Sequence, residues 1–196
     1  HIMATDPTAE QRNQITETFG IECLADNNSA IERADIVILA VKPQILQSVC
    51  KRIQTSVQTK QPLILSVAAG IRSSDIDRWL GNHQAIVRTM PNTPALIQSG
   101  ATGLYANANV TPEQKEQAEH IMRAAGLTIW VDEEQKIDAV TALSGSGPAY
   151  YFLFMEAMQS YAEQLGFSPE QARLLVQQSA LGSAELVAAN PELELS

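Results

Sequence analysis

The fold is decided by residues 35–43, DIVILAVKP, which carry the clearest strand signal in the chain. From Ile36 to Val41 every residue is apolar, and Pro43 ends the run. A hairpin strand with one solvent-exposed face alternates apolar and polar residues, whereas a parallel strand covered on both faces is apolar throughout. The segment therefore predicts a buried parallel strand, followed by a helix that runs to about Thr55.

The same pattern of strand then helix repeats along the first two thirds of the chain. Continuous apolar runs predict further strands, and a short edge strand is expected at Gly103-Leu104-Tyr105. The other runs lie at residues 2–5, 21–24, 63–67, 85–90 and 127–131. Because strands alternate with helices, we expect an α/β fold in which a doubly wound parallel sheet is wrapped by helices.

The pattern changes after Val131, where only helical signals remain. Helices are expected over residues 135–143, 150–165 and 169–189, so the domains are predicted to be 1–132 and an all-α domain at 133–196. The second of these helices is so rich in large apolar side chains that a small helical domain cannot cover them all. Core packing and a dimer interface both remain open as explanations.

Composition excludes several classes of function. The chain has 196 residues, of which 22 are Asp or Glu and 13 are Lys or Arg, which gives a net charge of −9. Without a cluster of cations it is a poor partner for nucleic acid or an anionic membrane. Its two cysteines and three scattered histidines make no metal site and favour a reducing, cytoplasmic location. No apolar run approaches the roughly 18 residues that span a bilayer.

Ligands of a doubly wound sheet bind beyond the carboxyl ends of its strands. The turns expected there are rich in small residues and proline, and together they predict a cofactor cleft, although each alone could be an ordinary turn. They are Thr5-Asp6-Pro7, Val41-Lys42-Pro43, Ala68-Ala69-Gly70 and Met90-Pro91-Asn92-Thr93-Pro94. Asp6 is suited to bind a ribose hydroxyl but is also a normal strand terminator. Asn27 could bind adenosine or, with Asn28 and Ser29, cap a helix.

The segment Ser144-Gly145-Ser146-Gly147-Pro148 interrupts the helical region. Free amides at a helix N-terminus, flanked by serines, suit a carboxylate, while a close crossing of helices would also need glycine. No strand is followed by G-x-G-x-x-G anywhere in the chain, and no G-x-S-x-G motif supports serine-hydrolase chemistry.

Four motifs together resemble the pyrroline-5-carboxylate reductase family in order and spacing, over essentially the whole chain. They are AVKP at 40–43, SVAAG at 66–70, RTMPNTPA at 88–95 and DAVTALSGSGPAY at 138–150. The family reduces 1-pyrroline-5-carboxylate to L-proline with NADPH, sometimes NADH, in the last step of proline biosynthesis. The resemblance implies a Rossmann domain at 1–132 and a helical substrate and dimerisation domain at 133–196, in dimers that can assemble into decamers.

The resemblance also implies a set of site residues. Thr5, Asp6, Pro7 and Asn27 would face the adenosine of the cofactor, and Ala40, Val41, Lys42, Pro43, Ala68, Ala69 and Gly70 would line its pyrophosphate and nicotinamide ribose. Met90, Pro91, Asn92 and Thr93 would lie near the nicotinamide, and Glu134, Ser144, Gly145, Ser146, Gly147 and Pro148 would border the substrate. No metal is implied.

Two departures from the family pattern stand out. The glycine phosphate loop is expected before residue 1, so residues 2–5 would be the second strand of the domain and native. The Ser-Pro-Gly-Gly-Thr-Thr segment, whose threonine would serve the imine nitrogen, is expected after Ser196. These residues alone are therefore expected to bind cofactor weakly and to be inactive. Asp6 would repel a 2′-phosphate, which weakens the expected preference for NADPH over NADH.

Two alternatives remain. A related hydroxyacid or imine reductase is one, but 3-hydroxyacid dehydrogenases carry a catalytic lysine where this chain has Tyr151, four residues beyond Gly147. The other is a non-catalytic α/β dimerisation fragment.

Overall fold

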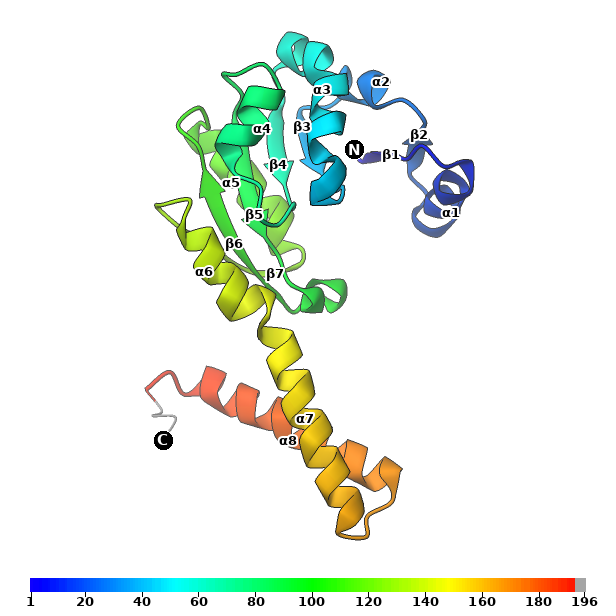
Figure 1. Ribbon diagram of the computed structural model, residues 1–196, viewed down its shortest axis with the longest axis vertical. Coiled ribbons are helices and arrows are strands. Elements are labelled where there is room, and N and C mark those ends of the chain that lie inside the picture. The colour runs from blue at the N-terminus through cyan, green and yellow to red at the C-terminus, as the bar shows by residue number, and fades with distance from the viewer. Residues whose placement is uncertain (193–196) are drawn as a thin grey trace. The chain divides into compact units, whose positions relative to one another are not determined.

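The computed structural model describes residues 1–192 of the chain. The chain divides into two compact units, His1–Gly145, which contains the sheet, and a helical unit that begins at Ser146 (Figure 1). This division falls later than the domain boundary predicted at residue 132, because helix α6 (Lys136–Val140) packs on strands β5 and β6.

The sheet unit has seven strands in two sheets. They are β1 (Met3–Thr5), β2 (Glu22–Leu24), β3 (Ile36–Leu39), β4 (Leu63–Ser66), β5 (Ile86–Met90), β6 (Gly100–Ala106) and β7 (Gly126–Trp130). β1 pairs with β2 in parallel, and the other sheet has the order β3-β4-β5-β6-β7. All pairs in it are parallel except β5 with β6. The predicted α/β class is therefore correct, with one antiparallel pair that the sequence did not indicate.

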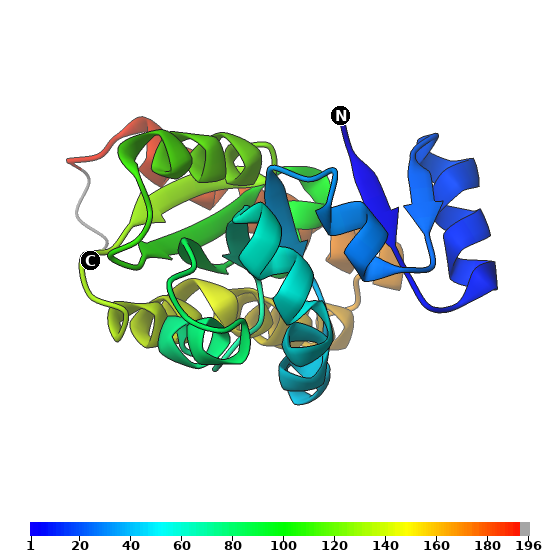
Figure 2. The same ribbon diagram turned by 90° about the horizontal axis from the view of Figure 1, so that it is seen from above.

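Helices cover both faces of the five-stranded sheet (Figure 2). They are α3 (Pro43–Lys60), α4 (Ser73–Trp79), α5 (Pro112–Arg123) and α6, while α1 (Ala9–Phe19) and α2 (Asn27–Ile31) pack on β1 and β2. Side chains of α3 and α4 form one buried cluster with one face of β3, β4 and β5. Side chains of α5 form a second cluster on the opposite face, with Leu65, Val87 and Leu104. Two further turns of helix complete the unit, the 3₁₀ helix η1 (Thr93–Ile97) and the π-helical turn η2 (Thr141–Gly145).

Strand β6 corrects one prediction. It was expected to be a short edge strand over 103–105, but it spans seven residues and lies between β5 and β7. Its small residues fit close neighbours: a Cβ on Gly103 would lie 2.7 Å from the Val140 side chain, and one on Gly100 would lie 2.8 Å from the Ala125 carbonyl oxygen. Glycine weakens the strand signal in the sequence, although here close packing requires it.

Strand β3 is less buried than its sequence predicted. All four residues of β4 are buried, whereas Ile38 of β3 is 47% exposed. Within the described residues β3 pairs only with β4, and β1 only with β2. Each of these two parallel strands therefore has one edge without a strand neighbour.

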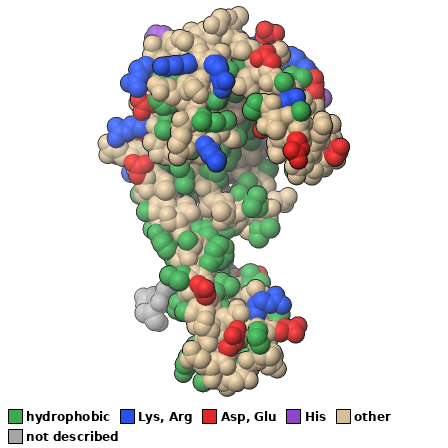
Figure 3. Space-filling view, turned by 45° about the vertical axis from the view of Figure 1, so that its right-hand side comes forward, with side chains coloured by type: hydrophobic (Ala, Val, Ile, Leu, Met, Phe, Trp, Pro, Cys, Tyr) green, Lys and Arg blue, Asp and Glu red, His purple; other side chains and the backbone are tan. Residues whose placement is uncertain are grey.

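The helical unit consists of α7 (Gly147–Gln164) and α8 (Pro169–Ala189), which pack against each other. Ser168 and Gln171 form a capping box at the start of α8, as Thr111 and Gln114 do for α5, where the sequence predicted one. Few side chains of α7 and α8 are buried, and hydrophobic ones reach the surface along them (Figure 3). None of the described helices is long and apolar enough to cross a membrane.

Candidate functional site

Three of the predicted turns leave the same edge of the sheet. β3, β4 and β5 are parallel neighbours, and their register places Leu39 beside Ser66 and Ser66 beside Arg88. Ser66 stabilises this edge. Its hydroxyl accepts a hydrogen bond from the Ala68 N–H (3.3 Å), and its carbonyl accepts one from the Thr89 hydroxyl (3.1 Å). The structure thus brings residues 40–43, 68–70 and 90–93 to one edge, where doubly wound sheets bind ligands.

The turn after β4 is suited to hold a flat ligand against its backbone. Ala69 and Gly70 are exposed, and a Cβ on Gly70 would meet no atom within 4 Å. Gly70 has φ +75°, a conformation that side-chain-bearing residues rarely adopt. Within residues 1–192 the backbone N–H groups of Ala69 and Gly70 donate no hydrogen bond. Small side chains and free donors are what a nicotinamide dinucleotide needs at this edge, so these residues fit the cofactor that the sequence implies.

Asn92 ties the turn after β5 to the π-helical turn. Its side-chain carbonyl accepts a hydrogen bond from the Ala101 N–H (2.9 Å), and its amide donates to the Ser144 carbonyl (3.0 Å). Gly145 lies against Met90, since a Cβ there would come within 2.8 Å of the methionine methyl group. Two predicted cofactor residues therefore contact two predicted substrate residues, all within the sheet unit.

The glycine–serine segment is helical up to Gly145 and is interrupted at Ser146, within the segment where a break was expected. The predicted helix at 135–143 is α6, which continues as the π-helical turn η2 and is followed by α7 from Gly147. π-Helical turns are rare and frequent at functional sites. Ser144 donates its hydroxyl to the Val140 carbonyl (3.0 Å). Ser146 is the N-cap residue of α7 but makes no capping hydrogen bond with its side chain.

The segment from Ser144 to Pro148 crosses the division between the two units. Ser144 and Gly145 end the sheet unit, while Ser146, Gly147 and Pro148 begin the helical unit. The pocket that these residues were predicted to border stays a prediction.

Glu134 has protein partners for both of its carboxylate oxygens. Oε1 accepts a hydrogen bond from the Ser73 N–H (2.5 Å), and Oε2 accepts one from the Ser73 hydroxyl (2.9 Å). Arg88 lies 3.4 Å from Oε1 and, through its other terminal nitrogen, 3.4 Å from Asp138. Ser73 and Arg88 were not among the predicted site residues. A charged residue inside the apolar strand 85–90 was the available signal for Arg88, because charged side chains are almost never fully buried unless paired.

The predicted adenosine end lies at the turn after β1. The Asp6 carboxylate accepts a hydrogen bond from the Thr8 N–H (2.8 Å), and Arg12 donates to the carbonyls of Asp6 (2.8 Å) and Pro7 (2.9 Å). Asn27 does not cap α2, since the N-cap is Asp26, whose carboxylate accepts from the Ser29 N–H (2.9 Å). Capping therefore leaves Asn27 available for another role.

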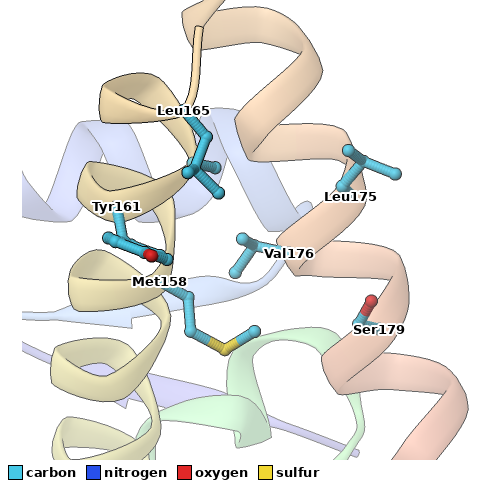
Figure 4. Close-up of a pocket in the computed structure, with 7 residues that line it drawn as sticks. Met158, Tyr161, Leu165, Leu175, Val176 and Ser179 are labelled. Atoms are coloured by element: carbon cyan, nitrogen blue, oxygen red, sulfur yellow. The ribbon is translucent and has the colours of Figure 1, made fainter. Parts of the chain in front are cut away.

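Two surface hollows lie away from the predicted turns. One, of about 240 Å³, is lined mostly by apolar side chains of α7 and α8. Figure 4 shows Val176 pointing from α8 toward α7, while Leu175 points away from it. The other, of about 430 Å³, lies on α3 and α4 and is lined by Gln47, Lys51, Gln54, Arg78 and Trp79. Neither contains a predicted site residue.

The described part of the chain offers no cluster of metal ligands, and one of its two thiols is buried. No group of three or more His, Cys, Asp or Glu side chains there could hold a metal ion. Cys50 is fully buried, and burial raises the pKa of its thiol to about 11, so it stays protonated at neutral pH.

The parallel strands, the small-residue turns at their carboxyl edge and the helical unit define an oxidoreductase of the dinucleotide-binding class. Comparisons with known proteins agree. A family model described as "NADP oxidoreductase coenzyme F420-dependent" matches residues 1–70, and one described as "Pyrroline-5-carboxylate reductase dimerisation" matches residues 134–195.

Individual relatives identify the family. The chain is 49% identical to the pyrroline-5-carboxylate reductase of Pseudomonas aeruginosa over 185 residues, 94% of this chain and 67% of that protein. It is similar to the structure of a pyrroline-5-carboxylate reductase from Coxiella burnetii (TM-score 0.93, 44% identity, covering 98% of this chain and 71% of that one). A Plasmodium falciparum pyrroline carboxylate reductase with NADP bound is also similar (TM-score 0.84, 29% identity, 95% and 67%). The chain belongs to the pyrroline-5-carboxylate reductase family.

Proposed function

We propose that the protein catalyses the NAD(P)H-dependent reduction of 1-pyrroline-5-carboxylate to L-proline, the last step of proline biosynthesis. The observation that carries this function is the carboxyl edge of the sheet, where the family motifs at 40–43, 66–70 and 88–95 converge beside the π-helical turn. We place the reaction in the cytoplasm, in keeping with the two free cysteines of the chain.

The protein's part in this reaction is mainly to position two flat rings. When bound, the reduced nicotinamide supplies a hydride to the imine carbon. The free N–H groups of Ala69 and Gly70 would hold the cofactor along the turn after β4, and Ala40 to Pro43 would flank it. Met90 to Thr93 would lie beside the nicotinamide, with Asn92 fixing the backbone of Ser144. Holding reacting atoms in line can supply much of the rate enhancement, because the entropy of alignment is lost on binding and not in the transition state.

The substrate carboxylate would bind at Ser144 to Pro148. The start of a helix carries a partial positive charge and suits an anion. The hydroxyl of Ser146 makes no capping hydrogen bond to α7, which supports this assignment. Tyr151 stands where hydroxyacid dehydrogenases carry a lysine, which supports an imine as the substrate. No catalytic residue is assigned among residues 1–192.

The cofactor preference depends on Asp6. We infer NADPH as the cofactor, with NADH as the alternative. A carboxylate after this strand accepts a hydrogen bond from the ribose 2′-hydroxyl of NADH and repels the 2′-phosphate of NADPH, whereas the nearby guanidinium of Arg12 attracts it. Titrating the full-length protein with adenosine 2′,5′-bisphosphate and with AMP gives a dissociation constant for each, and their ratio shows whether Asp6 or Arg12 dominates. The D6N variant should bind the bisphosphate more tightly than wild type does.

The domain organisation is proposed as a dinucleotide-binding domain at 1–132 and a helical substrate and dimerisation domain at 133–196. The edges of β1 and β3 that lack a strand neighbour support a further parallel strand between them in the complete domain. A glycine-rich loop after such a strand would meet the cofactor pyrophosphate.

We also propose that the protein forms homodimers, which could assemble further into decamers. The exposed apolar side chains of α7 and α8 support the dimer. No partner among nucleic acids or membranes is proposed, because the chain is acidic.

One assay tests the reaction. The full-length protein is mixed with 1-pyrroline-5-carboxylate and NADPH or NADH, and the absorbance of the reduced nicotinamide is followed. The expected result is oxidation of the reduced cofactor that depends on the imine. In the reverse direction, a 3-hydroxyacid should not reduce the oxidised cofactor. Absence of oxidation with both cofactors would leave the non-catalytic dimerisation module as the better hypothesis.

A further inference from the structure

Arg88 is a buried cation in the middle of strand β5, which lies between β4 and β6. Its side chain is 3% exposed, and its neighbours on β5 are apolar or hydroxyl-bearing. Removing a guanidinium from water is strongly unfavourable unless charged partners and hydrogen bonds compensate for the lost hydration. The two terminal nitrogens of Arg88 accordingly face two carboxylates, those of Glu134 and Asp138.

These contacts join the two segments that border the proposed site. Glu134 accepts both hydrogen bonds of Ser73, the first residue of α4, which follows the Ala68–Gly70 turn by three residues. Asp138 lies in α6, three residues before the π-helical turn η2. Arg88 therefore links the cofactor side of the site, through Glu134, to the helix that leads into the substrate side.

Glu134 is better placed for this link than for contact with substrate. Its side chain is 19% exposed, and its oxygens are taken by Ser73 and Arg88. Asp138, at 70% exposure, could not compensate the buried guanidinium alone, since water screens exposed charges. Glu134 is thus the principal counter-charge of Arg88.

We propose that Arg88 and Glu134 are positioning residues, which hold the Ala68–Gly70 turn and the π-helical turn η2 in fixed register so that the hydride donor and acceptor stay aligned. This role rests on the proposed reductase function. It assigns to Glu134 an action through Ser73 and Arg88 in place of direct contact with substrate.

The test uses three variants of the full-length protein, E134Q, S73A and R88K, with D75N as the control. E134Q keeps the size of the side chain and an acceptor for Ser73 but removes the charge opposite Arg88. D75N makes the same chemical change on α4, where Asp75 forms an exposed ion pair with Arg78 that contacts neither Glu134 nor Arg88. Steady-state kinetics give kcat and KM for imine and cofactor, and thermal unfolding gives Tm.

E134Q should lower kcat by about ten- to a hundred-fold, because small misplacements of reacting groups have effects of that size, while both KM values stay within roughly threefold of wild type. S73A, which removes one of two hydrogen bonds, should lower kcat by less, and R88K should resemble E134Q. D75N should match wild type. A rise in the KM for the imine at unchanged kcat would instead make Glu134 a substrate ligand and overturn the proposal. So would a lower Tm with unchanged kinetics.

Hydrogen exchange provides a readout that needs no turnover. Amides of residues 68–73 and 141–145 should exchange faster in E134Q than in wild type, and no faster in D75N. Unchanged exchange in both segments would overturn the positioning role even if the wild-type protein is an active reductase. If E134Q exchanges faster but the wild-type protein does not reduce the imine, the positioning role of Arg88 and Glu134 is supported. In that case only the proposed reductase function is contradicted.

Discussion

The two units of the chain differ in how they cover their apolar side chains. In the sheet unit, β4 is buried along its whole length, and Leu46, Ile64 and Leu104 have no exposed surface. In the helical unit, five consecutive residues of α7, from Tyr150 to Phe154, are each at least 60% exposed. One unit builds its own core, whereas the other carries apolar surface that its own residues do not cover.

The arrangement of these five residues indicates what covers them. Successive residues of an α-helix are about 100° apart, so five in a row reach every side of the helix. A helix that is hydrophobic all round is buried. We therefore expect α7 to be surrounded in the assembled protein, which explains the large apolar content that the sequence placed on this helix. Core packing, the alternative left open by the sequence, does not account for these exposures among residues 1–192.

The largest expected effect is in the core of the sheet unit. Leu65 of β4 is fully buried in the cluster beneath α5, and L65A should destabilise this unit by about 2–5 kcal/mol through lost burial and a cavity. Urea unfolding measures the change, and the loss should be the same at all protein concentrations. A loss under about 1 kcal/mol would contradict a self-sufficient core.

Phe154 tests the opposite behaviour in the helical unit. Its side chain is 66% exposed in the single chain, so F154A should cost little in the isolated chain but weaken association by about 1.5–3 kcal/mol, the value of one buried large apolar side chain. Sedimentation velocity over a dilution series gives the dissociation constant. The same constant for F154A and wild type would exclude Phe154 from the interface.

Matched helix caps sharpen the comparison. Thr111 and Ser168 form capping boxes in the sheet unit and the helical unit, and T111A and S168A should each cost about 1 kcal/mol. T111A should lower the midpoint of a thermal unfolding transition, that of the sheet unit, and this midpoint should not depend on protein concentration. S168A should lower the midpoint of the transition of the helical unit. The Tm of that second transition should rise with protein concentration, because folding of the helical unit is linked to association. Concentration dependence of both, or of neither, would remove the distinction between the units.

The smallest effect concerns Glu119 of α5. The Trp130 indole N–H donates to its carboxylate (2.9 Å), and this hydrogen bond, with the ion pair to Arg123, holds the pKa of Glu119 below its ordinary value of 4.5. A carboxyl whose pKa is lowered by folding stabilises the protein above that ordinary value, and the contribution is lost as pH falls through the lowered pKa. Stability curves from pH 6 to pH 3 should therefore be flatter for E119Q. Parallel curves would show that the hydrogen bond does not form in solution.

The fold was predictable wherever local pattern and burial agree. The apolar runs at 63–67 and 85–90 are central strands as expected, and the Thr111 capping box forms. Strand β6 was underestimated because its glycines serve contacts with Val140 and Ala125 that are distant in sequence. Ile38 is half exposed because burial of a strand residue depends on what packs on that face of the sheet, which the sequence of the strand itself does not specify.

The candidate site was predictable as a set of turns but not as a network. Strand ends and small residues pointed to 40–43, 68–70 and 90–93, and parallel pairing brings them together. The contacts of Asn92 with Ser144, and of Arg88 with Glu134, join residues 46 to 52 positions apart. Such pairs follow from tertiary packing, so no local spacing in the sequence could indicate them.

The central claim, that the sheet unit has its own buried core and the helical unit requires a second copy of the chain, is tested most directly by the mass of the protein in solution. Sedimentation equilibrium of the 196-residue chain at micromolar concentration should give twice the mass of one chain or a multiple of that dimer, and F154A should shift the equilibrium toward the single chain. The mass of one chain across the whole concentration range would contradict the claim.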